Sequence, residues 1–117
     1  MGFKFEKLGV WQSSLDFATK VSKVCANFPK DGLYILTAQF MRAADSICLS
    51  TAEGSTRRTN PEFSKFLGYA IRSGIECVSC IHLAKRRSLI NVAQFDERYD
   101  ELEAMIRQLQ ALRKTLN

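Results

Sequence analysis

Two thiols one helical turn apart, Cys77 and Cys80, are the first residues of this chain whose type and spacing could do chemistry. A structural zinc site needs four Cys, His or carboxylate ligands. The other cysteines, Cys25 and Cys48, are isolated, and the single histidine, His82, lies about 200 degrees around a helix from Cys80. A thioredoxin-like dithiol needs a helix N-terminus, whereas all four cysteines lie within helical patterns. The sequence therefore predicts reduced, buried cysteines and neither a metal nor a cofactor.

Carboxylates and the histidine offer no better route to catalysis. Glu53 and Glu62 flank a loop that holds Arg57 and Arg58, and carboxylates in such a setting form caps and ion pairs more often than an acid–base pair. No glycine-rich phosphate loop is present, and no strand pattern precedes a candidate for one. His82 has no nucleophile in a recognisable motif and is interpreted as a packed or interface side chain. We expect that the protein is not an enzyme.

These residues must be positioned by helices, because the chain shows helical periodicity throughout. Two prolines, together with Gly32 and Gly54, divide it into stretches near 8–28, 33–54, 61–87 and 92–116. Short connections favour an all-α, antiparallel up-down-up-down four-helix bundle that forms one domain over residues 1–117.

The turn between the second and third helices has a clear local pattern. We expect Gly54 to end the second helix in the left-handed conformation. Thr59 or Asn60 can cap the third helix, Pro61 suits its first turn, and Glu62 favours the positive end of its dipole.

Small and apolar residues of the third helix recur with heptad spacing, which is typical of helices that pack at a shallow angle. They are Phe63, Leu67, Ala70, Gly74, Cys77, Ile81 and Ala84. Ile71, Ile75 and Val78 form a second apolar row, and Arg42 and Asp45 are the only charged residues between 33 and 52. One interpretation is a central helix in a lopsided bundle. The favoured one is a subunit interface on the second and third helices, since monomers rarely expose large apolar patches.

Polar residues within these apolar helices are expected to be buried, and buried charges need partners. We predict that Arg42, Asp45 and Glu76 pair with one another, and with Glu53 form a polar network that sets the bundle register. A ligand site at these residues is the alternative.

Basic residues gather toward the two ends of the expected bundle, within a net charge of +5. The first end is expected to combine the N-terminus, the second loop and the C-terminus, with Lys4, Lys7, Arg57, Arg58, Arg113 and Lys114. The opposite end has Lys30, Lys85, Arg86 and Arg87. Each cluster is either a solvated surface or a polyanion site. With few aromatic residues expected nearby, contacts to phosphates are favoured over base stacking.

The composition of the chain, with 46% hydrophobic and 25% charged residues, is typical of a globular protein. The sequence has no apolar run long enough to cross a bilayer and no signal-peptide pattern near residue 1, so we expect a cytoplasmic location.

The chain resembles a bacterial four-helix-bundle family whose founding members are encoded in intervening sequences of 23S ribosomal RNA genes. The segments that carry the resemblance are 5–12, 28–29, 33–34, 42–47, 52–54, 62–63, 66–67, 73–74 and 76. After Glu53-Gly54 the family more often continues with an aromatic residue, glycine and arginine, whereas Ser55 and Thr56 precede Arg57 here. A role that depends on that aromatic residue or second glycine is therefore not carried over.

The resemblance implies a homopentameric ring of antiparallel bundles without catalytic activity. It also implies a relation to the accessory RNA-binding proteins of diversity-generating retroelements. Together with the basic clusters, it favours a non-enzymatic nucleic-acid-binding function, with RNA as the expected ligand. The alternative is a structural adaptor that holds a protein partner such as a reverse transcriptase.

Overall fold

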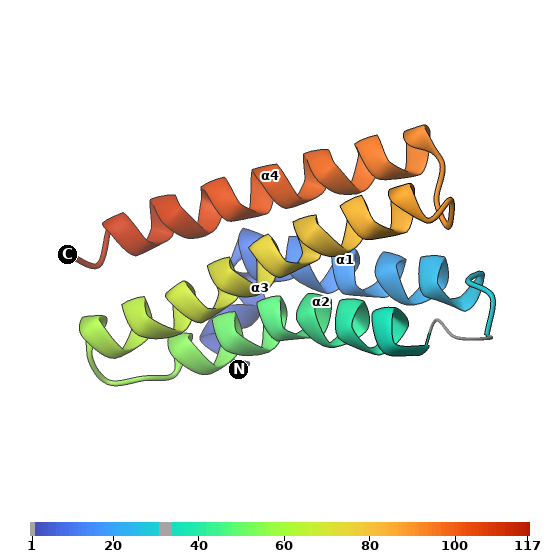
Figure 1. Cartoon of the computed structure of the whole chain (residues 1–117). Coiled ribbons are helices and arrows are strands. Elements are labelled where there is room, and N and C mark those ends of the chain that lie inside the picture. Colours follow the sequence, from blue (N-terminus) through green and yellow to red (C-terminus); the bar gives the residue numbers. More distant parts are fainter. Residues whose placement is uncertain (1, 31–33) are drawn as a thin grey trace.

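The chain folds into four α-helices and one short 3-10 helix in a computed structural model that describes residues 2–30 and 34–117. The elements are η1 (Lys4–Lys7), α1 (Gly9–Ala26), α2 (Tyr34–Ser55), α3 (Asn60–Arg86) and α4 (Val92–Lys114) (Figure 1). The described residues contain no strand, so the all-α class is confirmed. None of the helices in these ranges is long and apolar enough to cross a membrane.

The described helix ends lie within two residues of the ranges expected from sequence, while the expected start at residue 33 lies outside the described residues. Side-chain caps account for two of these ends. Thr59 Oγ1 accepts the backbone N–H of Glu62 at 3.3 Å, one residue after Pro61 in the first turn of α3. Asn91 and Gln94 form a reciprocal capping box at the start of α4, with both distances 2.8 Å.

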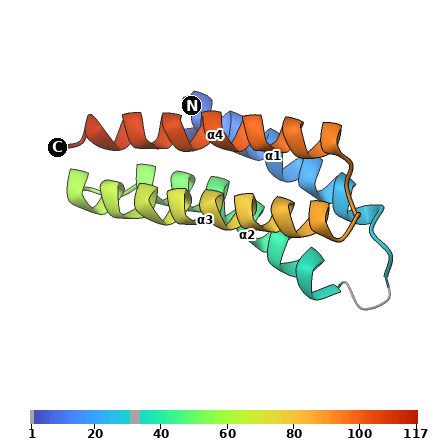
Figure 2. The same cartoon turned by 45° about the horizontal axis from the view of Figure 1, so that its top comes forward.

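The molecule is elongated and measures 45 × 23 × 21 Å, and successive connections between helices lie at alternate ends of its long axis (Figures 1 and 2). The α2–α3 loop and the C-terminus lie at one end, and the α3–α4 turn and the residues after α1 lie at the other. The 27 residues of α3 span about 40 Å at 1.5 Å per residue, which accounts for the long dimension. α2 packs closely against α1 and α3, whereas α1 packs only sparsely against α4.

Apolar side chains from all four helices form one core. The heptad row of α3 is buried from Leu67 to Ala84, as its spacing predicts. The largest fully buried apolar side chains are Phe17, Val21, Phe40, Ile47, Leu67, Cys77, Ile81, Leu102 and Leu109. Burial of each large apolar side chain stabilises the fold by roughly 1.5–3 kcal/mol, so the core holds the helix ends and their loops in place.

Candidate nucleic-acid interface

The loop after α2 is fixed by backbone and side-chain hydrogen bonds. Helix α2 continues through Gly54 to Ser55, and Ser55 Oγ donates to the carbonyl oxygen of Ala52 at 2.7 Å. Thr56 Oγ1 donates to the carbonyl of Glu53 at 2.8 Å, and the N–H of Arg57 donates to the carbonyl of Gly54 at 3.1 Å. These bonds satisfy carbonyls that would otherwise be unpaired at the helix end, so the short loop has a defined shape.

Gly54 does not end α2 in the left-handed conformation, so that expectation is wrong. The glycine is helical and buried, and α3 crosses it closely. A Cβ at Gly54 would lie 2.6 Å from Cβ of Phe66 and 3.1 Å from Cδ1 of Phe63. The residue is needed for the close approach of two helices rather than for a turn.

The two loop arginines differ in whether an intramolecular ion pair neutralises their charge. Arg57 pairs with Glu53 at 2.9 Å, and its guanidinium carbon lies 4.6 Å from the ring centroid of Phe66. Of the two carboxylates that flank the loop, Glu53 and not Glu62 forms the ion pair with Arg57, and this pair partly neutralises the arginine side chain. Arg58 is exposed and has no carboxylate within ion-pair distance among the described residues. Arg58 is thus the more available cation.

The end of α4 brings two further cations to the same end of the molecule (Figure 1). Arg113 Nε donates to Ser64 Oγ in α3 at 3.0 Å, and the guanidinium lies against Gly68. Lys114 is exposed in the last turn. Cations at a helix C-terminus also complement its dipole, which helps to hold them there.

Lys4 and Lys7 do not join this end, so their expected place in the cluster is wrong. Both lie in η1, which packs against α1 and α2 and is set back along the long axis from the α2–α3 loop (Figures 1 and 2). α1 has 18 residues and α3 has 27, a length difference of about 13 Å at 1.5 Å per residue. The described basic end therefore consists of Arg57, Arg58, Arg113 and Lys114, and we call it the loop-end patch.

The opposite end holds the second candidate set, Lys30, Lys85, Arg86 and Arg87, which are all exposed. Lys85 Nζ lies 4.5 Å from the ring centroid of Phe95, and His82 packs edge-on to the same ring at 4.9 Å. The first turn of α4, which follows the α3–α4 turn, contains no acidic residue, and Asp96 and Glu97 follow in its second turn.

The expected buried polar network is not present in the expected form. Arg42 and Glu76 form an ion pair at 3.7 Å, but the Arg42 side chain is 75% exposed, and Asp45 is exposed as well. Glu53 pairs with Arg57 instead. The burial expectation is wrong because the outer face of α2 is open to solvent and accommodates these charges without desolvation.

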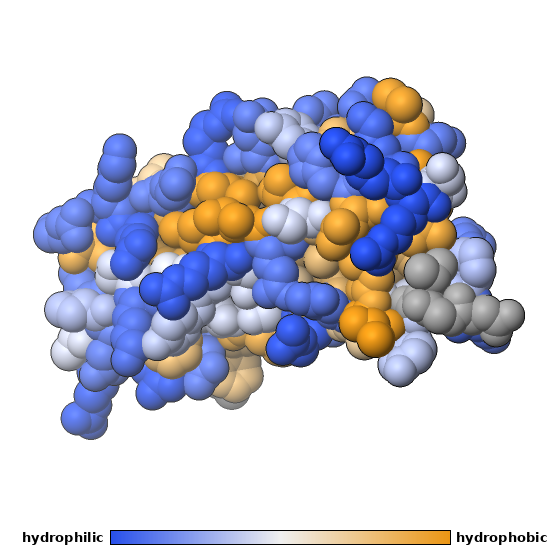
Figure 3. Space-filling view, in the orientation of Figure 1, coloured by the Kyte–Doolittle hydropathy of each residue, from blue (hydrophilic) through white to orange (hydrophobic). Residues whose placement is uncertain are grey.

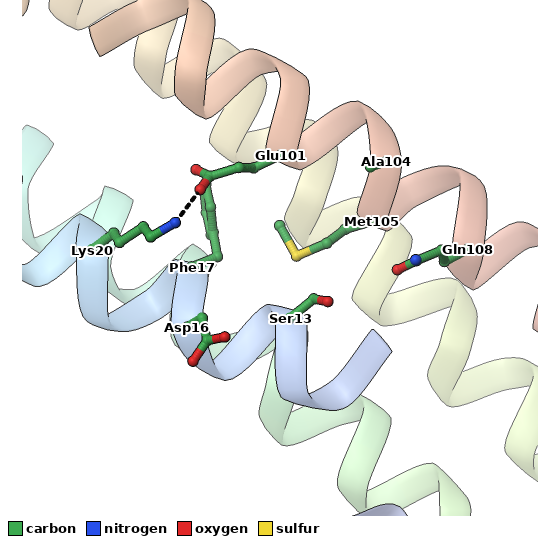
Figure 4. A pocket seen from close by; sticks show the side chains of 8 residues that line it. All are labelled: Ser13, Asp16, Phe17, Lys20, Glu101, Ala104, Met105 and Gln108. Atoms are coloured by element: carbon green, nitrogen blue, oxygen red, sulfur yellow. Dashed lines mark hydrogen bonds and ion pairs between the residues drawn. The ribbon is translucent and has the colours of Figure 1, made fainter. Parts of the chain in front are cut away.

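A different charged residue, Arg98, is buried, and its burial was not predicted from the sequence. Arg98 on α4 is 8% exposed and pairs with Glu97 at 3.1 Å and with Glu101. Lys20 on α1 pairs with Glu101 at 2.6 Å across a groove of 240 Å³ that Phe17 and Met105 also line (Figure 4). The burial of Arg98 could have been predicted, because position 98 lies three residues after Phe95 and four before Leu102 on the buried stripe of α4.

The cysteines are free and buried, and their surroundings suppress thiolate formation. Burial raises the pKa of Cys25 and of Cys80 from 9.0 to about 11, and that of Cys77 still further. Burial also raises the pKa of Cys48, with a smaller contribution from the Asp45 charge. Within residues 2–30 and 34–117, no three Cys, His or carboxylate side chains are grouped as metal ligands.

Thiol labelling tests this description. At Cys25 and Cys80, a pKa of about 11 in place of 9.0 lowers the thiolate fraction at neutral pH about 100-fold, and burial acts in the same direction at Cys48 and Cys77. Native protein at pH 7.5 should therefore leave all four thiols unreacted with Ellman's reagent while urea-unfolded protein reacts fully. Rapid reaction of one or more thiols in the native protein would contradict the burial described.

The apolar row proposed for a subunit interface is only partly available. Ile75 is 54% exposed, whereas Ile71 and Val78 are half-buried against the core of their own chain. Apolar side chains form a band along the face where α3 and α4 meet, bordered by hydrophilic residues (Figure 3). On α2, Ile35 and Leu49 are 63% and 65% exposed. Exposed apolar area thus extends over several helices.

Comparisons with known proteins agree with this fold. The model of the family described as 23S rRNA-intervening sequence protein matches residues 6–111. A crystal structure of a protein of unknown function from the S23 ribosomal protein family of Bacteroides thetaiotaomicron superposes with a TM-score of 0.82 at 20% identity, covering 90% of this chain and 98% of that chain. That likeness concerns the fold alone, and no curated protein matches the chain. Since the family model covers most of the sequence, the chain belongs to the 23S rRNA-intervening sequence protein family.

Proposed function

We propose that this protein is a non-enzymatic, oligomeric nucleic-acid-binding protein that favours RNA and contacts phosphates through basic bundle ends. The observation that carries the proposal is the loop-end patch, where Arg58 and Lys114 are exposed cations beside Arg57 and Arg113. Ser64 holds the Arg113 side chain and Glu53 holds that of Arg57 at this end of the molecule. The family name adds a connection to ribosomal RNA genes, and a cytoplasmic location suits such a ligand.

Oligomerisation strengthens the proposal. We infer an antiparallel up-down-up-down bundle that assembles into a closed homopentameric ring, supported by the exposed apolar residues on α2 and α3. A pentamer would present about 20 loop-end cations together, and affinity for nucleic acid rises with the number of phosphates neutralised at once. The same four cations on a monomer would bind weakly.

A binding titration at increasing salt tests the function. Fluorescence anisotropy with a labelled single-stranded RNA should give a dissociation constant that rises steeply with salt, with a log–log slope of about 0.7 for each phosphate contacted. An absence of RNA binding at low salt would overturn the proposal.

The alternative is an adaptor that holds a protein partner such as a reverse transcriptase. The exposed apolar residues Ile35, Leu49 and Ile75 favour this candidate, because apolar docking surfaces are typical of protein partners. Association by apolar contact should change little between low and physiological salt. The salt titration, repeated with the partner, therefore separates the two functions.

Replacement of Ile75 by glutamate should dissociate the oligomer without unfolding the subunit. The side chain is 54% exposed in the single chain, so a charge is tolerated there but not in an apolar interface. Sedimentation at micromolar concentration should show the wild type well above 13.3 kDa and the variant close to it. Ser22→Glu on the exposed face of α1 is the control and should keep the oligomer. A monomeric wild type would contradict the assembly.

A further inference from the structure

A broad hollow lies beside the loop-end patch, between the first half of α3 and the last turn of α4. Its volume is 680 Å³, and the residues that matter here are Ser64, Lys65, Gly68, Tyr69, Arg72 and Arg113. Gly68 provides room for Arg113, because a Cβ at that position would lie 3.2 Å from Nη2 of the arginine. The hollow is therefore formed by both helices and was not evident from either segment alone.

The side chains of three cations line this hollow, and no Asp or Glu side chain does. Lys65, Arg72 and Arg113 have no ion-pair partner among the described residues. The groove between α1 and α4 is different, because it holds Asp16 and Glu101. Uncompensated positive charge in a concave surface concentrates anionic ligands there.

Tyr69 supplies an aromatic surface among these cations. It is 36% exposed, and Phe66 supports it edge-on with ring centroids 5.4 Å apart. Lys65 Nζ and the Arg72 guanidinium carbon lie 6.0 and 5.8 Å from its centroid, at the outer limit of cation–π contact. Neither cation is held strongly against the Tyr69 ring, so a planar ligand can displace both from the face of the ring.

The hollow is continuous with the loop-end patch through Phe66. That ring contacts Tyr69 on one side and carries the Arg57 guanidinium at 4.6 Å. A nucleic-acid strand that contacts Arg57 and Arg58 can therefore extend along α3 to Tyr69. The sequence-based expectation of phosphate contacts without stacking left this aromatic residue out.

We propose that the hollow binds single-stranded RNA, with a base stacked on Tyr69 and the neighbouring phosphates held by Lys65, Arg72 and Arg113. The inference rests on the proposed RNA-binding function and adds the form of RNA that is recognised. A duplex hides its base faces, whereas an unpaired base exposes one for stacking on an aromatic side chain. Because every base has such a face, the site tolerates sequence variation.

Replacement of Tyr69 by alanine tests the inference by fluorescence anisotropy with a labelled 12-nucleotide single strand and with its duplex. Loss of one stacked base weakens binding roughly 5- to 150-fold, so the variant should bind the single strand at least about fivefold more weakly. Duplex binding should stay unchanged, and Tyr69→Phe should retain single-strand affinity. Tyr99→Ala is the matched control, because Tyr99 is 38% exposed in a different groove.

Three outcomes separate this inference from the function on which it rests. Equal single-strand affinity for wild type and Tyr69→Ala, or an equal loss for single strand and duplex, would overturn the stacking site. The RNA-binding function would still stand if Arg58→Glu weakens binding. Wild-type protein that binds neither RNA would overturn both. Circular dichroism and sedimentation of each variant show whether a loss of affinity has a structural cause instead.

Discussion

Gly54→Ala should lower the free energy of unfolding by about 1–3 kcal/mol, the range for overpacked sites. The new Cβ would lie 2.6 Å from Cβ of Phe66, an atom fixed to the α3 backbone that cannot rotate away. Alanine favours a helix over glycine by up to about 1 kcal/mol, which offsets only part of the cost. Urea unfolding followed by circular dichroism measures the net change.

Gly9→Ala is the matched control for this experiment. Gly9 begins α1, and a Cβ there meets no atom within 4 Å. Its replacement should leave stability unchanged or raise it slightly, because alanine is the better helix former. Equal unfolding midpoints for the two variants would show that α2 and α3 do not approach each other as closely as described.

Arg58→Glu should weaken RNA binding by about tenfold or more, the value of one charge-assisted contact. Arg58 is exposed and lacks a carboxylate partner in the described residues, so its replacement disturbs no ion pair of the fold. The double variant Arg57→Glu and Arg58→Glu should bind still more weakly, but it also breaks the Arg57–Glu53 pair. Anisotropy at physiological salt measures both, and helicity and oligomer size should match the wild type.

Arg86→Glu makes the same charge change at the opposite end of the molecule and should have a much smaller effect. If the double variant at Arg57 and Arg58 binds RNA as well as the wild type, the loop-end patch is not the binding surface. A large loss from Arg86→Glu would then identify Lys85, Arg86 and Arg87 as the surface.

Helix positions could be predicted because capping residues are local. Thr59 and Pro61 act on backbone groups within one turn, so their types alone indicate a helix start. Gly54 shows the limit of such reasoning. Glycine serves both left-handed caps and close helix crossings, and only the position of Phe66 in the fold distinguishes the two.

The candidate site was harder to predict because it depends on relative helix lengths and on contacts between distant residues. Lys4 and Lys7 were misplaced because the sequence does not state where α1 begins relative to the start of α3. Part of the hollow can be recognised in the sequence, since Lys65, Tyr69 and Arg72 share one face of α3 at spacings of four and three. Arg113 joins them only through the packing of α4 on α3.

Ultraviolet cross-linking of the wild-type protein to single-stranded RNA, followed by digestion and mass spectrometry, shows which surface of the protein contacts the RNA. It needs no substitution, so folding defects cannot affect the result. We expect adducts within residues 54–72 and 110–117, which contain the loop-end patch and the hollow. Adducts confined to residues 23–30 and 85–97, or none at RNA concentrations well above the measured dissociation constant, would contradict this expectation.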